Sequence, residues 1–433
     1  MKIAVVGLWH SGEVYSGCLA DLGNHIIGID KNSKIVNNLN RGIAPLAEPK
    51  LEDIINRNIK KGRLKYITDF STISSCDAIW MTIDTPIDKA AHGNLSKIFT
   101  YIKKSLPFIK NGAILIISSQ LPVGTSKKII KFIKANRKNF MFDYAYIPEN
   151  LQLGKAVDSF MKPSRVVIGT DDIKRLEVII KIFEKLKTNI LLVNIASAEM
   201  VKHATNAFLA TSLSFIYDIA DVCEKVGADV TEVSQSLRAD SRIGEKAYLD
   251  ASAGFSGGHL DRDLQYLRKI AKDQKLNLPV ISSVLKKNKK RSAIVFERIS
   301  PLLKTFQGKT ITFWGITYKS GTPTLTHSLP LKLAKEAVSQ GSKINLCDLW
   351  VNKDDIKGEI NGEYGYFTDP YESVKSSNAT ICITPWPELK NLNFKKIARS
   401  MANPKIFFDA RNYFNDEKNI IERAGIKYIG VGR

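Results

Sequence analysis

The amino-acid sequence predicts an α/β fold in which two doubly wound domains with parallel sheets are joined by a helical middle. In the N-terminal half, short apolar strands alternate with amphipathic helices. From about residue 196 the pattern changes to long helical stretches without strands, and buried strand patterns return after Lys309. Strands that alternate with helices are typical of parallel sheets covered on both faces. We therefore expect domains at residues 1–195, 196–300 and 301–433.

The first strand, turn and helix have the pattern of a dinucleotide-binding unit. An apolar strand leads into Gly7, a helix follows over about residues 11–22, and a second strand ends at Asp30. Gly7 permits the tight turn, Gly12 permits close packing of helix on strand, and Asp30 can bind the adenosine ribose, which favours NAD over NADP. Trp9 stands where the pattern has its middle glycine. Its indole points away from the cofactor or alters cofactor binding, and both alternatives stay open.

Three more strands of this half end in polar residues, near Thr85, near Ser119 and before Glu149. The carboxyl ends of parallel strands are where open α/β sheets bind ligands. Beyond the helical middle, four segments predict buried strands: TITFWGITYKSG, KINLCDLW, ATICITPW and KIFFDARN.

The helical middle begins with one long amphipathic helix, over about residues 197–227. Lys202 and Asn206 are four residues apart and therefore share a face of it. A Lys/Asn pair is ordinarily part of a solvated face, but here the neighbours indicate partial burial: Met200, Ala204, Ala207 and Phe208. A buried Lys and Asn together can polarise a hydroxyl or carbonyl group and handle its proton.

Composition indicates a globular protein, with 433 residues, 44% hydrophobic and 25% charged. The N-terminus predicts no signal peptide, and no apolar run approaches the ~18–20 residues that span a bilayer. The five cysteines are scattered without metal-binding spacing, so we expect buried thiols in a reducing cytoplasm and no metal.

The net charge of +21 has three interpretations. One is binding to nucleic acid or membranes, and another is an anionic small-molecule substrate. We favour a Lys-rich surface without a nucleic-acid or membrane partner, because the lysines are spread along the whole chain. The densest cluster, KKNKKR at residues 286–291, has no interleaved aromatic residues and is expected in or beside a helix.

The stretch GFSGGHLDRD, at residues 254–263, contains three glycines within five residues. It predicts a loop whose backbone comes close to a ligand. His259 follows the glycines, where such a loop would present a reactive side chain.

Eight segments resemble the UDP-glucose/GDP-mannose dehydrogenase family, in family order and along essentially the whole chain: GLWHSG with Asp30, LPVGT, PENLQLGKAVDSFMKPSRVVIG, SAEMVKHATNAF, DSRIG, GFSGGHLDRD, GITYKSGT and FDARN. The resemblance implies an N-terminal Rossmann domain that binds NAD, a central helical domain with a long dimer-forming helix, and a C-terminal Rossmann-like domain that binds a UDP-sugar. It also implies oxidation of a sugar C6 alcohol to a carboxylate by two hydride transfers to NAD. A cysteine of the family holds the intermediate as a thiohemiacetal and then as a thioester.

The resemblance also implies roles for individual residues. Those at the catalytic centre are Lys202, Asn206, Asp263, Glu149 and His259. Those contacting the cofactor are Gly7, Trp9, Gly12, Asp30, Thr85, Ser119, Gln120 and Arg262. Those contacting the substrate are Glu149, Asn150, Leu151, Lys202, Asn206, Arg242, Tyr248, Leu249, Gly254, Ser256, Gly257, Lys319 and Arg411, with Arg242 reaching across a dimer.

Four positions depart from the family pattern. His259 aligns with the catalytic cysteine, Gln120 with a threonine, Thr326 with an arginine that contacts the cofactor, and Trp9 with a glycine. Imidazole can act as a base, but it is a poor substitute for a thiolate that must hold a covalent intermediate.

We therefore expect a cytoplasmic, NAD-dependent nucleotide-sugar dehydrogenase that acts on a UDP-sugar and stops after one hydride transfer. It is expected to be a homodimer or a larger homo-oligomer. The alternative is a degenerate family member that binds a nucleotide sugar without oxidising it.

Overall fold

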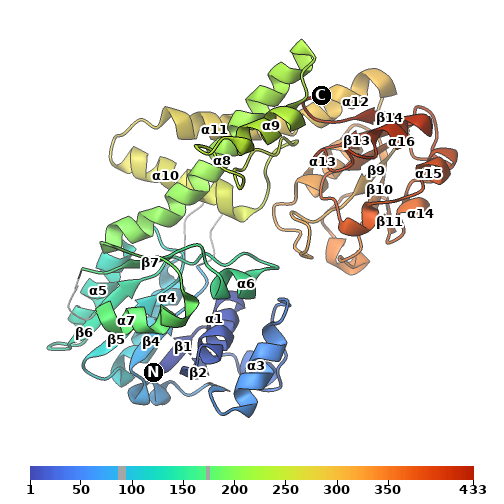
Figure 1. The fold of residues 1–433 in the computed structure, drawn as a ribbon. Coiled ribbons are helices and arrows are strands. Elements are labelled where there is room, and N and C mark those ends of the chain that lie inside the picture. The colour runs from blue at the N-terminus through green and yellow to red at the C-terminus, as the bar shows by residue number, and fades with distance from the viewer. Residues whose placement is uncertain (86–93, 172–175) are drawn as a thin grey trace. The chain divides into compact units, whose positions relative to one another are not determined.

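The computed structural model describes residues 1–85, 94–171 and 176–433 of the chain. They fold into two compact units, the N-terminal unit (residues 1–205) and the C-terminal unit (residues 206–433), whose elements are labelled in Figure 1. The division into three domains remains a prediction from the sequence. In the described parts of the chain, no helix is both long enough and apolar enough to span a bilayer.

The N-terminal unit contains a sheet with eight strands among its described residues: β1 (Lys2–Val6), β2 (His25–Ile29), β3 (Leu64–Ile67), β4 (Ala78–Met81), β5 (Ala113–Ile117), β6 (Phe142–Tyr146), β7 (Val166–Gly169) and β8 (Ile190–Val193). The strand order is β3-β2-β1-β4-β5-β6-β7-β8. The first six strands follow the 3-2-1-4-5-6 order of dinucleotide-binding folds. They pair in parallel, and β7 joins β6 antiparallel.

Helices cover both faces of this sheet: α1 (His10–Asp21), α2 (Ser33–Asn40), α3 (Leu51–Lys60), α4 (Ser96–Ser105), α5 (Thr125–Asn136), α6 (Ala156–Met161) and α7 (Leu176–Phe183). Short 3-10 turns lie at Phe70–Ser75 (η1), Leu106–Phe108 (η2) and Glu184–Leu186 (η3). Alternate residues of β1 enter two separate cores, Ile3 and Val5 on one face and Ala4 and Val6 on the other. This alternation makes β1 a continuous apolar run, because both of its faces are buried.

The long helix predicted from the sequence is a single helix, α8 (Ile195–Val226), of 32 residues. Its first turns are fixed to the LPVGT segment of the N-terminal unit. Glu199 accepts hydrogen bonds from the backbone N–H groups of Gly124 (2.6 Å) and Ser126 (2.7 Å), and Nε2 of His203 lies 3.0 Å from the carbonyl oxygen of Leu121. These bonds orient the turn of α8 that carries Lys202.

The C-terminal unit continues with helices alone and then forms a second sheet. The helices are α9 (Val230–Ala239), α10 (Gly258–Asp273), α11 (Pro279–Arg291) and α12 (Ile294–Leu303). The strands are β9 (Thr310–Trp314), β10 (Lys343–Cys347), β11 (Tyr364–Phe367), β12 (Ala379–Cys382), β13 (Ile406–Asp409) and β14 (Lys427–Ile429). They pair in parallel in the order β11-β10-β9-β12-β13-β14, which is again 3-2-1-4-5-6. The two doubly wound sheets confirm the predicted fold class.

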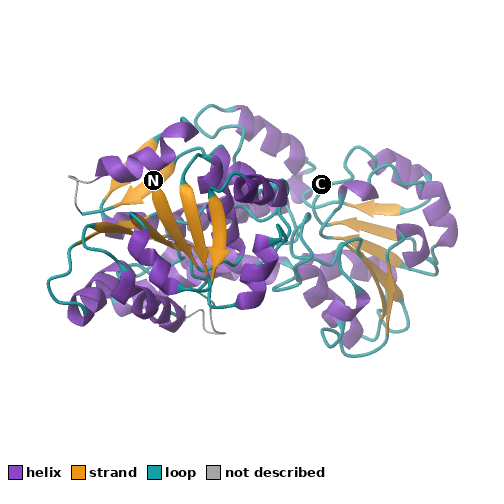
Figure 2. Ribbon diagram, turned by 90° about the horizontal axis from the view of Figure 1, so that it is seen from below, coloured by secondary structure: helices purple, strands orange, loops and turns teal. Residues whose placement is uncertain are grey.

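Helices also flank the second sheet, as the strands and helices of Figure 2 show. They are α13 (Leu329–Ser339), α14 (Pro370–Ser373), α15 (Phe394–Ser400) and α16 (Lys418–Arg423), with 3-10 turns at Lys353–Ile356 (η4) and Pro387–Leu389 (η5). One hydrophobic core joins this sheet to the preceding helices, since it contains Ile216 of α8, Val295 of α12 and Phe313 of β9.

The two sheets repeat one local arrangement at their first turn. In the N-terminal unit, Leu8 N–H donates to the Asp30 carboxylate over 2.9 Å. In the C-terminal unit, Ile316 N–H donates to the Asp348 carboxylate over 2.8 Å. In each case the residue before the donor is a glycine with positive φ, so the aspartate after the second strand holds the turn that follows the first strand.

The basic cluster KKNKKR forms the last turns of α11. Lys287 pairs with Asp218 and Asp221 of α8, each at 2.6 Å. Arg291, which is almost fully buried, also binds Asp221 and donates to the carbonyl oxygen of Ser252 over 2.9 Å. These two cations therefore stabilise the packing of α11 on α8.

Candidate active site

The glycine turn of the N-terminal unit brings backbone very close to backbone. Gly7 has φ +95°, and a Cβ on Gly12 would lie 1.8 Å from the carbonyl oxygen of Gly7. Only glycine fits at position 12 without moving the first turn of α1. Trp9 caps α1 with φ −83°, so a side chain causes no backbone strain there, and its indole is half exposed.

Asp30 is buried at the end of β2 and bonds to three groups. Its carboxylate accepts hydrogen bonds from Leu8 N–H and Asn32 N–H, each at 2.9 Å, and from the Tyr101 hydroxyl at 3.3 Å. Burial and the Asp30 charge both raise the pKa of Tyr101, which keeps that hydroxyl a neutral donor. Asp30 therefore orders the glycine turn in addition to its predicted role toward the ribose.

The predicted polar strand ends lie next to each other. Thr85 donates to the carbonyl oxygen of Gln120 over 2.7 Å, which joins the segments after β4 and β5. Ser119 is buried at the same edge. The segment after β6 continues the series with Glu149.

Glu149 and Lys202 form a charged pair after β6. The ammonium of Lys202 lies 3.9 Å from Oε2 of Glu149, and both side chains are largely buried. Oε1 of Glu149 accepts a hydrogen bond from Leu151 N–H, which fixes the carboxylate against its own segment. Asn150, between these two residues, is exposed.

Glu48 binds the start of α1, and its role was not predicted from the sequence. Glu48 binds Nε2 of His10 at 2.7 Å and accepts hydrogen bonds from the backbone N–H groups of Gly154 (2.8 Å) and Ala156 (3.0 Å). Burial alone would raise the pKa of Glu48, but these bonds together hold it below its usual range. Glu48 therefore connects α1 to the segment that follows Leu151.

Glu13 lies one turn further along α1 and is fully buried. Burial raises its pKa to about 9, and the neighbouring carboxylates of Glu48 and Glu52 add to the shift, whereas the backbone N–H of Leu46 lowers the pKa. Glu13 is therefore neutral at pH 7.

In the C-terminal unit, four predicted residues form a connected polar network. Asn206 donates from its amide to Oδ2 of Asp263, and both are buried. Nε of Arg262 lies 3.9 Å from Oδ1 of Asp263. Nη2 of Arg262 lies 3.1 Å from Nδ1 of His259. Helix α10 begins at Gly258, so His259 lies on its first turn rather than within the loop that the sequence suggested.

The glycine loop itself is tightly bonded within its unit. Ala253 N–H donates to the carbonyl oxygen of Ala410 over 3.1 Å. Ser256 donates to the carbonyl oxygen of Tyr318 over 3.1 Å. A Cβ on Gly257 would lie 2.7 Å from the Tyr318 ring. The loop therefore lies between the segments that carry two predicted substrate contacts, Lys319 and Arg411.

The other predicted substrate contacts of this unit differ in their exposure. Arg242 is exposed and binds its neighbour Asp240 through two nitrogens, at 3.0 and 2.6 Å. Tyr248 is exposed, whereas Leu249 is buried and accepts a hydrogen bond from Ser234. Thr326, which the sequence predicts at the position of a family arginine, is exposed.

All five cysteines are free and buried, as predicted: Cys18, Cys76, Cys223, Cys347 and Cys382. Burial raises the pKa of Cys347 to about 12 and also raises that of Cys18, Cys76 and Cys382. Because the thiolate is the nucleophilic form, these four cysteines lack the properties of a covalent catalyst, and Cys223 is buried in a hydrophobic core. No group of metal-binding side chains occurs among the described residues.

The strand order of the two sheets and the glycine turn after β1 indicate the class of protein. The N-terminal glycine turn, with no room for a side chain at Gly12 and with a helix N-terminus beside it, fits a dinucleotide. Residues 1–187 match the NAD-binding domain of the UDP-glucose/GDP-mannose dehydrogenase family. Residues 196–290 match its central domain, and residues 312–416 match its UDP-binding domain.

Two curated relatives and two solved structures extend over the whole chain. The UDP-glucose 6-dehydrogenase TuaD of Bacillus subtilis is 30% identical over 100% of this chain and 93% of its own length. A UDP-glucose 6-dehydrogenase of Rickettsia bellii is 29% identical over 100% of this chain and 99% of its own. In fold, the chain is similar to a UDP-glucose dehydrogenase from Pyrobaculum islandicum (TM-score 0.89, 23% identity, 100% and 97% of the two chains). It is also similar to a UDP-D-ManNAc dehydrogenase from Pyrococcus horikoshii (TM-score 0.86, 23% identity, 100% and 99%).

The chain belongs to the UDP-glucose/GDP-mannose dehydrogenase family. It is thus a nucleotide-sugar dehydrogenase, an NAD-dependent oxidoreductase that acts on a CH–OH group.

Proposed function

We propose that this dehydrogenase acts on a UDP-sugar, oxidises one alcohol to the aldehyde level, and stops there. The observation that carries the proposal is the state of its thiols. The family's cysteine position holds His259, and each of the five cysteines is buried in a core. Without a thiolate, the aldehyde cannot be held as a thiohemiacetal, which is the form the family oxidises a second time.

The groups needed for the first oxidation are present. NAD, when bound, accepts a hydride from the carbinol carbon. Lys202 and Asn206, on one face of α8, would stabilise the negative charge that develops on the alcohol oxygen. Asp263, which orients the Asn206 amide, would assist transfer of the hydroxyl proton. Gly7, Gly12 and the N-terminus of α1 would hold the pyrophosphate of NAD.

We also propose that the active form is a homodimer in the cytoplasm. Along α8, four apolar side chains are half or more exposed in the single chain: Phe208, Phe215, Val222 and Val226. They are spaced by 7, 7 and 4 residues, which places them on one stripe of the helix. A second copy would cover this stripe. Arg242, which is exposed and bound to its neighbour Asp240, would then turn toward the partner's substrate.

The experiment is an incubation of the purified chain with NAD and a panel of UDP- and GDP-sugars that begins with UDP-glucose. NADH formed per sugar consumed is measured, and hydroxylamine traps any aldehyde for mass analysis. We expect about one NADH per sugar and a trapped aldehyde. A ratio of two with a uronate product would contradict the single oxidation, and binding of a UDP-sugar without NADH would establish the degenerate alternative. His259→Cys is the matched variant, in which some second oxidation should return.

A further inference from the structure

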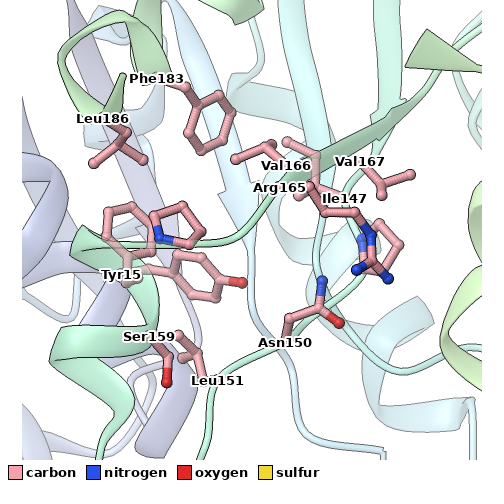
Figure 3. A pocket seen from close by; sticks show the side chains of 13 residues that line it. Tyr15, Ile147, Asn150, Leu151, Ser159, Arg165, Val166, Val167, Phe183 and Leu186 are labelled. Atoms are coloured by element: carbon pink, nitrogen blue, oxygen red, sulfur yellow. The ribbon is translucent and has the colours of Figure 1, made fainter. Parts of the chain in front are cut away.

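A pocket in the N-terminal unit lies beside the segment that follows β6, as Figure 3 shows. Its wall is mostly apolar and comes from five parts of the unit, including Tyr15 of α1, Ile147, Phe160 of α6, Val166 of β7 and Phe183 of α7. We call it the Arg165 pocket, after the one ionised side chain in its described lining. Neither Glu149 nor Lys202 lines it, so it is distinct from the charged pair described above.

Four polar side chains line this pocket: Tyr15, Asn150, Arg165 and Ser159, whose hydroxyl donates to the carbonyl oxygen of Lys155. Figure 3 shows the Tyr15 hydroxyl pointing into it, toward the amide of Asn150 and the guanidinium of Arg165. The Tyr15 ring is held by Trp80 (5.1 Å between centroids) and by Phe160 (5.4 Å). Burial raises the pKa of Tyr15 well above its ordinary range, so its hydroxyl is neutral at physiological pH.

None of the described residues balances the charge of Arg165. Its side chain is half buried, and no hydrogen bond or ion pair joins it to another of the described residues. Other arginines of this unit do have partners, since Arg57 binds Asp21 at 2.8 Å and Arg137 donates to the carbonyl oxygen of Leu106 at 3.0 Å. The described lining of the pocket also contains no Asp or Glu. A guanidinium has five N–H donors and stays charged, and a partly desolvated cation is favourable only when it is paired.

We propose that the Arg165 pocket binds a short-chain monocarboxylate, with the carboxylate on Arg165 and the hydrocarbon chain against the apolar wall. Arginine binds carboxylates through two parallel hydrogen bonds. Tyr15 and Asn150 supply further donors for the same anion. The cavity volume is about 50 Å³, which holds about four water-sized groups at ~10–15 Å³ each.

The apolar wall distinguishes this ligand from phosphate. A phosphate has four oxygens, and those turned toward Phe183 and Val166 would lose their hydrogen bonds to water without replacement. A carboxylate has its two oxygens on one end, so its alkyl chain faces the wall. The pocket therefore matches an anion that is polar at one end only.

Butyrate is the probe, and titration followed by saturation-transfer NMR on the full-length chain is the measurement. A ligand of this size reaches a dissociation constant of about 1 mM within the usual limit for binding energy per atom. We expect millimolar binding of butyrate, with butyramide and inorganic phosphate at least about tenfold weaker. Arg165→Met should weaken butyrate binding by about tenfold or more.

Lys162→Met is the matched control, because Lys162 is an exposed cation three residues away that does not line the pocket. It should leave the butyrate constant unchanged. Arg165→Lys, which keeps the charge but loses the paired donors, should lie between the wild type and Arg165→Met, and circular dichroism establishes that each variant is folded. Equal binding of butyrate and butyramide, an unchanged constant in folded Arg165→Met, or no saturation transfer in the wild type would each overturn the proposal. These readouts do not depend on dehydrogenase activity.

Discussion

Nη2 of Arg262 lies 3.1 Å from Nδ1 of His259, and the two residues are three positions apart on the first turn of α10. A guanidinium has donors and no acceptor. Nδ1 of His259 must therefore accept, and the ring proton of the neutral imidazole is on Nε2. The His259 ring is thus held through the lone pair of Nδ1, and its N–H group is at Nε2.

This bond predicts the tautomer of His259. In protein labelled with ¹⁵N-histidine, the His259 signals, assigned by comparison with His259→Gln, should report a proton on Nε2 and none on Nδ1 at neutral pH. Arg262→Met should release the ring and give a mixture of tautomers. Arg268→Met, an exposed arginine of the same helix, is the control and should change nothing. A protonated Nδ1 in the wild type would contradict the assigned hydrogen bond.

Lys202 should matter more for the first oxidation than His259. Its side chain is 13% exposed and lies 3.9 Å from Glu149, whereas His259 is exposed. Lys202→Ala removes the cation that would stabilise the alcohol oxygen, so we expect kcat for the first oxidation to fall by ~10³-fold or more. His259→Ala should cost less, about 10²-fold, which is the lower end of the range for one acid–base group. Lys225→Ala, on the exposed end of the same helix, serves as the control. A larger loss of kcat in His259→Ala than in Lys202→Ala would show that His259 is the essential group.

The two glycines of α1 at positions 12 and 17 should respond differently to an added methyl group. A Cβ on Gly12 would lie 1.8 Å from the backbone oxygen of Gly7, whereas one on Gly17 would lie 3.3 Å from the flexible end of Leu51. Gly12→Ala should therefore destabilise the protein by about 1–3 kcal/mol and abolish NAD binding in calorimetry. Gly17→Ala should stay within about 1 kcal/mol of the wild type, because the helix gains from alanine. Retained NAD affinity in Gly12→Ala would mean that the turn relaxes.

The fold was predictable where strands are buried on both faces. Strands such as β5, whose five residues are all buried, form continuous apolar runs in the sequence. The two edge strands of the second sheet, β11 and β14, were not predicted from the sequence. Every residue of β11 is only partly buried, and β14 has three residues, so neither leaves an apolar run.

From residue spacing alone, without the family resemblance, the candidate site was predictable only where its residues are close in sequence. The spacing of Gly7, Gly12 and Asp30 predicts the dinucleotide turn because all three belong to one strand–helix–strand unit. The bond between Asn206 and Asp263 joins residues 57 positions apart, and no periodicity connects them. The same holds for Glu48, whose backbone donors follow it by more than 100 residues.

The exposed stripe on α8 should be a dimer contact. Phe208 and Val226 are each 71% exposed in the single chain, which is unusual for large apolar side chains. The double variant Phe215→Glu with Val222→Glu should convert a homodimer into a monomer in light scattering at micromolar concentration, because it places four charges in the contact. Lys225→Glu, which lies off the stripe, should remain dimeric. A monomeric wild type would contradict both the dimer and the role of Arg242 across it.

Glu13 predicts a pH dependence of stability that can be removed by one substitution. Its pKa in the folded protein is about 9, against 4.5 for an ordinary glutamate. Between these values the unfolded chain has lost the proton and the folded protein has kept it. The unfolded state therefore binds fewer protons, and the free energy of unfolding falls as the pH rises, by about 1.4 kcal/mol per pH unit for this group alone.

Glu13→Gln places a neutral group at the same position and should abolish this contribution. Its free energy of unfolding, measured in urea, should increase relative to the wild type as the pH rises from about 5 to 8, by roughly 1.4 kcal/mol per pH unit. Near pH 4.5 the difference in the free energy of unfolding reports mainly packing, because most of the contribution from the Glu13 proton has not yet developed there. Asp53→Asn removes an exposed acid of α3 and should show no such slope. A constant difference in the free energy of unfolding between wild type and Glu13→Gln across this range would contradict the prediction. It would mean that Glu13 is ionised in the folded protein.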